Sequence, residues 1–212
     1  MHGDTDQAIA LPLDGRTPAR FQMHGTTIAL KLGENHRWVA AMIRGPSGSG
    51  KSDLALRCLA QPLGSLLPDS GVPTGVSLIA DDRTELSAAG QAPNLTITAS
   101  SPPSIAGLIE VRGLGIVAVP HIPSAQLVLI VDLVSPRDVS RFPTPATTTI
   151  GPIGIIDDRA TAQHVAVLPQ ITLTPFEASS PLKLMLALIQ TAMTGSPMVA
   201  DAAKHHRLPE GQ

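Results

Sequence analysis

The segment Gly45-Pro46-Ser47-Gly48-Ser49-Gly50-Lys51-Ser52 has the residue types and the spacing of a phosphate-binding loop. It matches the pattern G-x-x-x-x-G-K-[ST] at every fixed position. Because glycine has no side chain, backbone N–H groups can surround an anion at these positions. Lys51 can reach the β- and γ-phosphates of a nucleotide, and the Ser52 hydroxyl can ligate Mg²⁺. The alternative interpretation is a flexible loop that is rich in Gly and Ser.

The residues on either side of this loop favour nucleotide binding. The apolar run 38–43 predicts a buried strand before the loop. Residues 53–60 predict a helix after it, because apolar side chains recur there at i,i+4 spacing. The motif requires this order of strand, loop and helix. The loop would then lie at a helix N-terminus, where the helix dipole attracts phosphate.

The composition limits the classes of protein to consider. The chain has 212 residues, of which 43% are hydrophobic and 15% charged, so a single globular domain with a substantial core is expected. The formal net charge is −2 and there is no basic stripe, which argues against nucleic acid as a partner. The longest apolar stretch, 127–134, is too short to cross a membrane, and no signal peptide is visible. We therefore expect a cytoplasmic protein.

Aromatic residues are scarce: the chain has three Phe, one Trp and no Tyr. The core must therefore be built from aliphatic side chains, and Cys58 is expected to be a small core residue. With so few aromatic rings, a stacking platform for a base is not expected. Adenine, if bound, would be held by aliphatic contacts.

The remaining sequence predicts a mixed α/β fold, with a phosphate loop on a mixed sheet, antiparallel hairpins and few helices. Residues 27–32 alternate as a half-buried strand does, and 33–36 predict a hairpin turn into the strand before the loop. Such a hairpin is unusual in a small-nucleotide kinase. We expect a loose segment at 1–20, a catalytic domain at 21–195 and a polar tail at 196–212.

Other elements follow from local patterns. Strands are predicted at 76–80 and 127–134, a surface strand at 95–99, and short strands with loops over 141–173. Ser180 and Pro181 predict the N-cap and first residue of a helix that ends near Gly195.

A phosphate loop needs a carboxylate on a neighbouring strand, for a metal ion or for the attacking group. Asp81 and Asp82 follow one predicted strand, whereas Asp132 lies in another. Adjacent residues of an extended strand point to opposite faces, so only one of Asp81 and Asp82 can face the γ-phosphate. The residues by themselves leave the choice between this pair and Asp132 open.

The apolar segment 108–116 contains an acid, Glu110, a base, Arg112, and two glycines. Burial of such charges is costly unless they are paired or bind something. Taken alone, Glu110 and Arg112 slightly favour a structural ion pair.

Three motifs in this order resemble the HPr kinase/phosphorylase family: G-P-S-G-S-G-K-S at 45–52, I-A-D-D-R at 79–83 and I-E-V-R-G-L-G-I at 109–116. The His24-Gly25 pair upstream is also similar to the family pattern. The resemblance covers about residues 22 to 190, the catalytic domain of the family, without the usual N-terminal domain. It implies an ATP- and Mg²⁺-dependent protein serine kinase that acts on the phosphocarrier HPr.

The resemblance also implies roles for single residues. His24 falls at the catalytic histidine and Lys51 at the loop lysine. Ser52 and Glu110 fall at the magnesium ligands, and Asp82 falls at the acid/base that exchanges a proton with the serine hydroxyl. Arg141 falls at a catalytic arginine, within a short matching context.

One segment departs from the family pattern. The family has a Pro/Arg/Gly-rich stretch before its last helix, associated with dephosphorylation, whereas residues 175–180 here contain no arginine. We therefore expect the reverse phosphorolysis to be weak. The rival functions are a small-molecule kinase or NTPase that uses Asp132, and a non-catalytic nucleotide sensor. The sequence leaves self-association into a homo-oligomer open.

Overall fold

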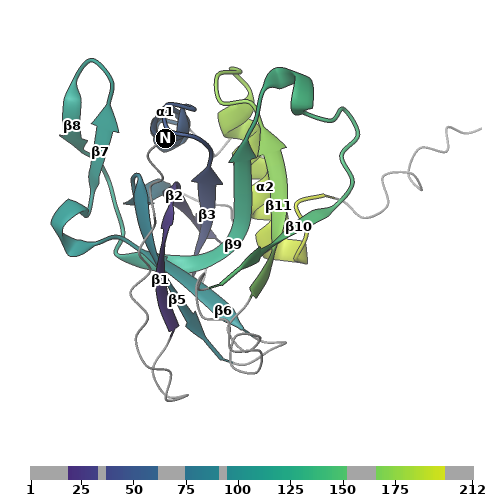
Figure 1. The fold of residues 1–212 in the computed structure, drawn as a ribbon, viewed down its shortest axis with the longest axis horizontal. Coiled ribbons are helices and arrows are strands. Elements are labelled where there is room, and N and C mark those ends of the chain that lie inside the picture. Colours follow the sequence, from purple (N-terminus) through teal and green to yellow (C-terminus); the bar gives the residue numbers. More distant parts are fainter. Residues whose placement is uncertain (1–18, 33–36, 62–74, 91–94, 152–165, 199–212) are drawn as a thin grey trace, which may run out of the picture.

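The computed structural model describes residues 19–32, 37–61, 75–90, 95–151 and 166–198. In this part of the chain, nine strands form one curled sheet, a further hairpin stands apart from it, and two α-helices pack against the sheet (Figure 1). The strands are β1 (Ala19–His24), β2 (Thr26–Leu32), β3 (Arg37–Arg44), β4 (Val76–Ala80), β5 (Arg83–Ala89), β6 (Thr96–Ser100), β7 (Leu108–Val111), β8 (Gly115–Ala118), β9 (Ser124–Leu133), β10 (Ala146–Ile150) and β11 (Ala166–Leu173). The helices are α1 (Lys51–Leu59) and α2 (Ser180–Thr194), with short 3₁₀ turns at Pro103–Ile105 and Pro136–Asp138.

The large sheet mixes parallel and antiparallel pairs, as the sequence predicted. Its order is β1-β5-β6-β9-β3-β2-β4. Strand β11 also pairs with β9, and β10 pairs with β11. Strand β9 is parallel to both β3 and β11. Strand β2 is antiparallel to both β3 and β4, so β4 also runs parallel to β3. The carboxyl ends of β3, β4, β9 and β11 therefore lie at one edge of the sheet, where ligands of α/β proteins bind.

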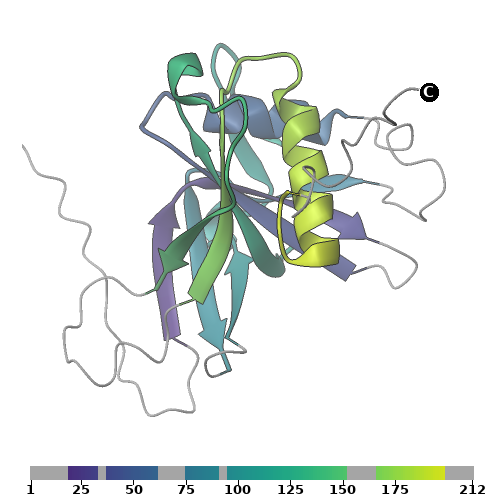
Figure 2. The same cartoon turned by 90° about the vertical axis from the view of Figure 1, so that its right-hand side faces the viewer.

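The sheet is buried on both faces around the phosphate loop. Ile28 and Leu30 of β2 pack into the cluster that α1 and α2 cover, whereas Ala29 belongs to the cluster inside the curl of the sheet. Figure 2 shows the two helices beside the sheet, with α1 across its upper end and α2 along its side. The predicted strand at 27–32 is confirmed as β2, but it is buried on both faces over most of its length and not on one, because a second apolar layer covers its other face.

Other predictions need similar adjustment. Strand β6 lies between β5 and β9, with Ile97 and Ala99 buried, so it is not a surface strand. Strand β1 begins at Ala19, inside the segment expected to be loose; the rest of that segment, 1–18, lies outside the described residues. The predicted turn at 33–36 and tail residues 199–212 also lie outside them, although the β2–β3 pairing confirms the hairpin itself.

The starts of the two helices differ by one or two residues from the predicted ones. Gly50, with φ of 93°, precedes α1, which begins two residues before the predicted start. Ser179 rather than the predicted Ser180 is the N-cap of α2, and the Ser180 hydroxyl donates to the Thr174 carbonyl oxygen at 2.6 Å. Gly195 ends α2 in a left-handed conformation, as predicted.

Cys58 is fully buried on α1, and burial raises the pKa of its thiol to about 12, as expected of a core residue. None of the helices in the described ranges has the length and hydropathy needed to span a bilayer.

Candidate active site

The phosphate loop connects the end of β3 to the start of α1, as its sequence context required. Gly48 and Gly50 both have positive φ, of 78° and 93°, so the loop needs glycine at these two positions. The Lys51 side chain is buried, and its ammonium donates to the carbonyl oxygens of Gly45 at 3.0 Å and Pro46 at 3.1 Å. The backbone of the loop therefore holds the Lys51 ammonium in place, where the ammonium can contact a bound anion.

Asp81 lies at the end of β4 and is buried beneath the loop. Its Oδ1 accepts hydrogen bonds from the hydroxyls of Thr26 and Ser52, both at 2.8 Å. Its Oδ2 accepts from the backbone N–H of Glu110 at 3.0 Å. One carboxylate therefore joins β2, the phosphate loop and the β7–β8 hairpin, and it orients the hydroxyl of Ser52.

Asp82 faces the opposite way and is exposed. Its φ of 61° makes it the one non-glycine residue with positive φ in the described part of the chain. This conformation turns the chain sharply from β4 into β5, and aspartate tolerates it better than most residues. The two aspartates therefore differ in burial, and the turn between the strands produces this difference, not the alternation of side chains along one strand. Which of them faces a γ-phosphate stays a prediction.

His24 ends β1 beside this turn. Its Nδ1 lies 3.1 Å from Asp82 Oδ1, and both side chains are largely solvent-accessible. The Gly25 N–H donates to the Asp82 carbonyl oxygen at 3.0 Å, and Thr84 Oγ1 donates to the Gly25 carbonyl oxygen at 3.0 Å. These bonds hold the end of β1 against the β4–β5 turn, so that the His–Asp pair is in a defined place.

Glu110 and Arg112 lie on β7 and at the turn after it. No ion pair forms between them among the described residues, so the structural pairing that the sequence slightly favoured is wrong. Arg112 instead extends over the phosphate loop: a Cβ placed on Gly48 would lie 3.0 Å from Arg112 Nη2. The hairpin thus brings one acid and one base to the loop.

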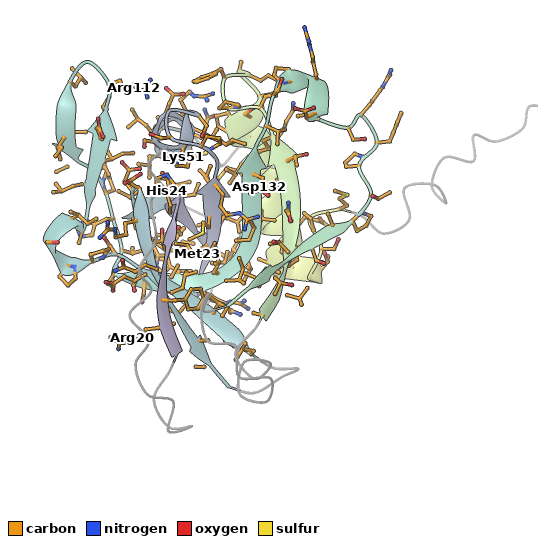
Figure 3. All side chains as sticks on the ribbon, viewed as in Figure 1. Arg20, Met23, His24, Lys51, Arg112 and Asp132 are labelled. Carbon is orange, nitrogen blue, oxygen red and sulfur yellow. The ribbon has the colours of Figure 1, made fainter. Side chains whose placement is uncertain are left out.

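These residues surround a single hollow of ≈ 360 Å³ above the loop. It is lined by Ser47, Gly48, Gly50, Lys51, Ser52, Asp53, Leu56, Asp82, Glu110, Val111, Arg112 and Phe176. In Figure 3, Arg112 lies between the β7–β8 hairpin and α1, with Lys51 just below α1 and His24 below Lys51. The structure therefore brings together most of the residues that the sequence singled out.

Two of the candidate residues lie elsewhere. Asp132 of β9 accepts a two-point ion pair from Arg44, at 2.7 and 2.9 Å, and a hydrogen bond from Gln170 at 2.6 Å. Arg141 is exposed on the segment after β9, and its guanidinium lies 5.6 Å from the centroid of the Phe142 ring. Neither residue lines the hollow, and a catalytic role for Arg141 stays a prediction.

One contributor to the hollow was missed by the sequence reasoning. Phe176 lines the hollow from the segment between β11 and α2. The local sequence contained no signal for this role, because the neighbours of Phe176 in space include Gly50 at the start of α1.

A phosphate loop between a strand and a helix, on a mixed sheet with carboxylates at the same edge, defines a P-loop-type kinase fold. The solved structure of the HPr(Ser) kinase/phosphatase from Coxiella burnetii has this fold: it superposes with a TM-score of 0.52 and 22% identity, over 81% of this chain and 95% of that one. No family model matches the chain.

Curated sequences extend this likeness. The chain is 32% identical over 116 residues to the HPr kinase/phosphorylase of Enterococcus faecalis, and the match covers 55% of this chain and 30% of the relative. It is 36% identical over 107 residues to that of Neisseria meningitidis, covering 47% and 28%. The matched part is thus under a third of the length of these relatives. The resemblance identified in the sequence is confirmed: the chain is similar to HPr kinase/phosphorylases in both sequence and fold.

Proposed function

We propose that this protein is a protein serine kinase of the HPr kinase type, which transfers the γ-phosphoryl group of ATP to a serine of an HPr-like phosphocarrier. One observation supports this proposal most strongly. Residues of the phosphate loop, Asp82 and Glu110 all line one hollow, and His24 lies 3.1 Å from Asp82. The names of the curated relatives supply the acceptor, and the protein would act in the cytoplasm.

The charges around the hollow suit a triphosphate. Lys51 and Arg112 supply positive charge from two different elements, the loop and the β7–β8 hairpin. Arg112 lies over Gly48, where a Cβ would crowd its guanidinium. Preorganised cations of this kind stabilise the charge that spreads over a phosphoryl group during transfer.

Ser52 and Glu110 would hold Mg²⁺ with oxygen ligands. Both line the hollow, and Asp81 orients the Ser52 hydroxyl, so the donors have the hard character that this cation prefers. Among the described residues no three His, Cys, Asp or Glu side chains form a cluster that could hold a metal. Mg²⁺ bound to one or two protein ligands takes its remaining ligands from water and substrate phosphates, and it neutralises phosphate charge.

Asp82 would act as the base in the forward direction. Its exposed carboxylate borders the hollow and can accept the proton of a serine hydroxyl that enters from solvent. The imidazole of His24, 3.1 Å from this carboxylate, would fix its orientation. The proton would return to the phosphoserine oxygen in the reverse direction.

The test is to incubate the purified chain with ATP, Mg²⁺ and HPr and to locate the phosphate by mass spectrometry. Phosphoserine on HPr is the expected product. ADP release that does not require HPr would indicate a small-molecule kinase or NTPase. Binding of ATP without any turnover would indicate a nucleotide sensor.

A further inference from the structure

Phe176 is a large apolar side chain that the fold leaves open to solvent at the edge of the hollow. Its exposed fraction is 71%, in a chain with only three Phe. The other strongly exposed ring in the described part of the chain, Phe142, lies under the Arg141 guanidinium and away from the hollow. An exposed aromatic ring contributes little to the stability of the fold. Beside a phosphate loop, such a ring indicates a surface that a ligand covers.

The ring rests directly on the phosphate loop. A Cβ placed on Gly50 would lie 2.9 Å from Phe176 Cζ and 3.0 Å from its Cε1. Leu56, one turn further along α1, lines the same hollow. Phe176 and Leu56 therefore supply apolar surface next to the loop that would hold the phosphates.

The backbone on both sides of Phe176 is anchored to α1. The Arg57 guanidinium donates to the carbonyl oxygen of Pro175, and to that of Glu177 at 3.1 Å. Arg57 is itself held by Asp53 at 2.9 Å. Because these bonds order the segment before any ligand binds, a ligand that stacks on the ring would lose little affinity to ordering it.

The sheet order indicates which part of a nucleotide would reach this ring. Asp82 and Glu110, the residues of the transfer chemistry, lie on the β4 side of the loop. The segment with Phe176 follows β11, which lies beyond β9 on the opposite side of β3. A triphosphate with its reacting end toward Asp82 would direct its nucleoside end toward β11.

We propose that Phe176 is the stacking platform for the nucleobase, with Leu56 completing the apolar surface. This inference rests on the proposed function, because it requires a nucleotide in the loop. It also replaces the expectation from composition that aliphatic contacts alone would hold adenine. Stacking on a single ring is tolerant of the base, so purine nucleotides in general would be bound.

The experiment compares two ligands that share the phosphates but not the base. ATP and inorganic tripolyphosphate are titrated with Mg²⁺ into the wild type and Phe176→Ala by calorimetry. We expect Phe176→Ala to weaken ATP binding about tenfold and to leave tripolyphosphate binding unchanged. Phe176→Trp should retain the affinity for ATP. Met193→Ala, which removes an exposed apolar side chain on α2 that does not line the hollow, should change neither titration.

The possible results separate the two proposals. Equal ATP affinity of Phe176→Ala and the wild type, or an equal loss for both ligands, would overturn the role of the ring and leave the phosphate site standing. A wild type that binds tripolyphosphate but not ATP would do the same. Binding of neither ligand by the wild type would overturn the proposed function, and this inference with it.

Discussion

At the scale of single residues, Asp81 and Asp82 show how surroundings determine what a carboxylate can do. Asp81 accepts three hydrogen bonds and is buried, so its lone pairs are engaged in holding the site together. Among the described residues the Asp82 carboxylate has His24 as its close partner, and 75% of the side chain is exposed, so that it can meet a substrate. Adjacent residues of the same type thus have different chemical roles.

Lys51→Ala should abolish phosphoryl transfer and leave the melting temperature near that of the wild type. The glycines set the shape of the loop, whereas the ammonium supplies the charge that meets the phosphates. Rate assays with HPr, together with thermal melts, test this expectation. A variant that still transfers phosphate and melts normally would remove the loop from the mechanism.

Asp82→Asn should stop transfer to serine without a loss of stability, because an exposed amide cannot take the proton. Asp132→Asn should transfer at a rate near the wild type but melt at a lower temperature, because it weakens the ion pair with Arg44. Kinase rates and melts of both variants provide the comparison. An inactive Asp132→Asn beside an active Asp82→Asn would reverse the assignment of the acid/base.

Glu110→Gln should raise the Mg²⁺ concentration that gives the half-maximal rate. The amide occupies the same space but lacks the charge that a hard cation prefers, and the backbone N–H bond to Asp81 does not involve the side chain. The measurement is the kinase rate over a range of Mg²⁺ concentrations. If the curve does not move, Glu110 has no part in metal binding.

At the scale of elements, the site depends on α2, although this helix contributes none of the proposed catalytic residues. Its buried face packs in the same cluster as α1 and the strand before the phosphate loop. The position of the loop is therefore set in part by side chains at the far end of the sequence.

Leu188→Ala should destabilise the protein by roughly 2–5 kcal/mol, because it leaves a cavity in that cluster. Leu186→Ala on the same helix is the matched control, since 45% of that side chain is exposed, and it should cost less than about 1 kcal/mol. Urea unfolding of the two variants and the wild type measures both values. Similar losses for the two variants would contradict the assigned packing face of α2.

At the scale of the whole molecule, the segment 175–180 bears on the charge beside the site, because it contains Glu177 and no arginine. Glu177 stands in that segment, and its hydrogen bond from Lys183, at 2.6 Å, lowers the pKa of its carboxyl. The group is therefore ionised at neutral pH. The nearby Lys183, which is the cation closest in sequence to this segment, is already paired with Glu177.

We therefore expect phosphorolysis of phosphoserine-HPr to be much slower than the forward kinase reaction. Inorganic phosphate must approach a phosphoserine, and dense anions need positive charge to hold them close. Pyrophosphate release at millimolar phosphate is the measurement. Glu177→Gln should raise this rate at neutral pH, because it removes a negative charge beside the site. A wild-type reverse rate comparable to the forward rate would contradict the expectation.

The sequence alone determined the parts of this protein whose cause is local. The phosphate loop, the strand before it and the helix after it lie within 24 consecutive residues, 37–60, and their signals are spacing and apolar runs. Strand β4 and the end of α2 at Gly195 are equally local, and both were predicted where they occur. The Asp81–Asp82 pair could likewise be placed at a strand end, with one carboxylate facing the site.

Only the tertiary structure decided the features that depend on contacts between residues distant in the sequence. Strands β1 and β5 have mixed polar and apolar residues, and each becomes a strand by pairing with the other across 59 to 69 residues of sequence. Asp81 is structural because Thr26, Ser52 and Glu110 reach it from three elements. Phe176 meets Gly50 because β3 and β11 both run parallel to β9 and therefore end at one edge of the sheet. A local sequence pattern does not indicate such a contact, because the free energy that stabilises the contact comes from residues distant in the chain.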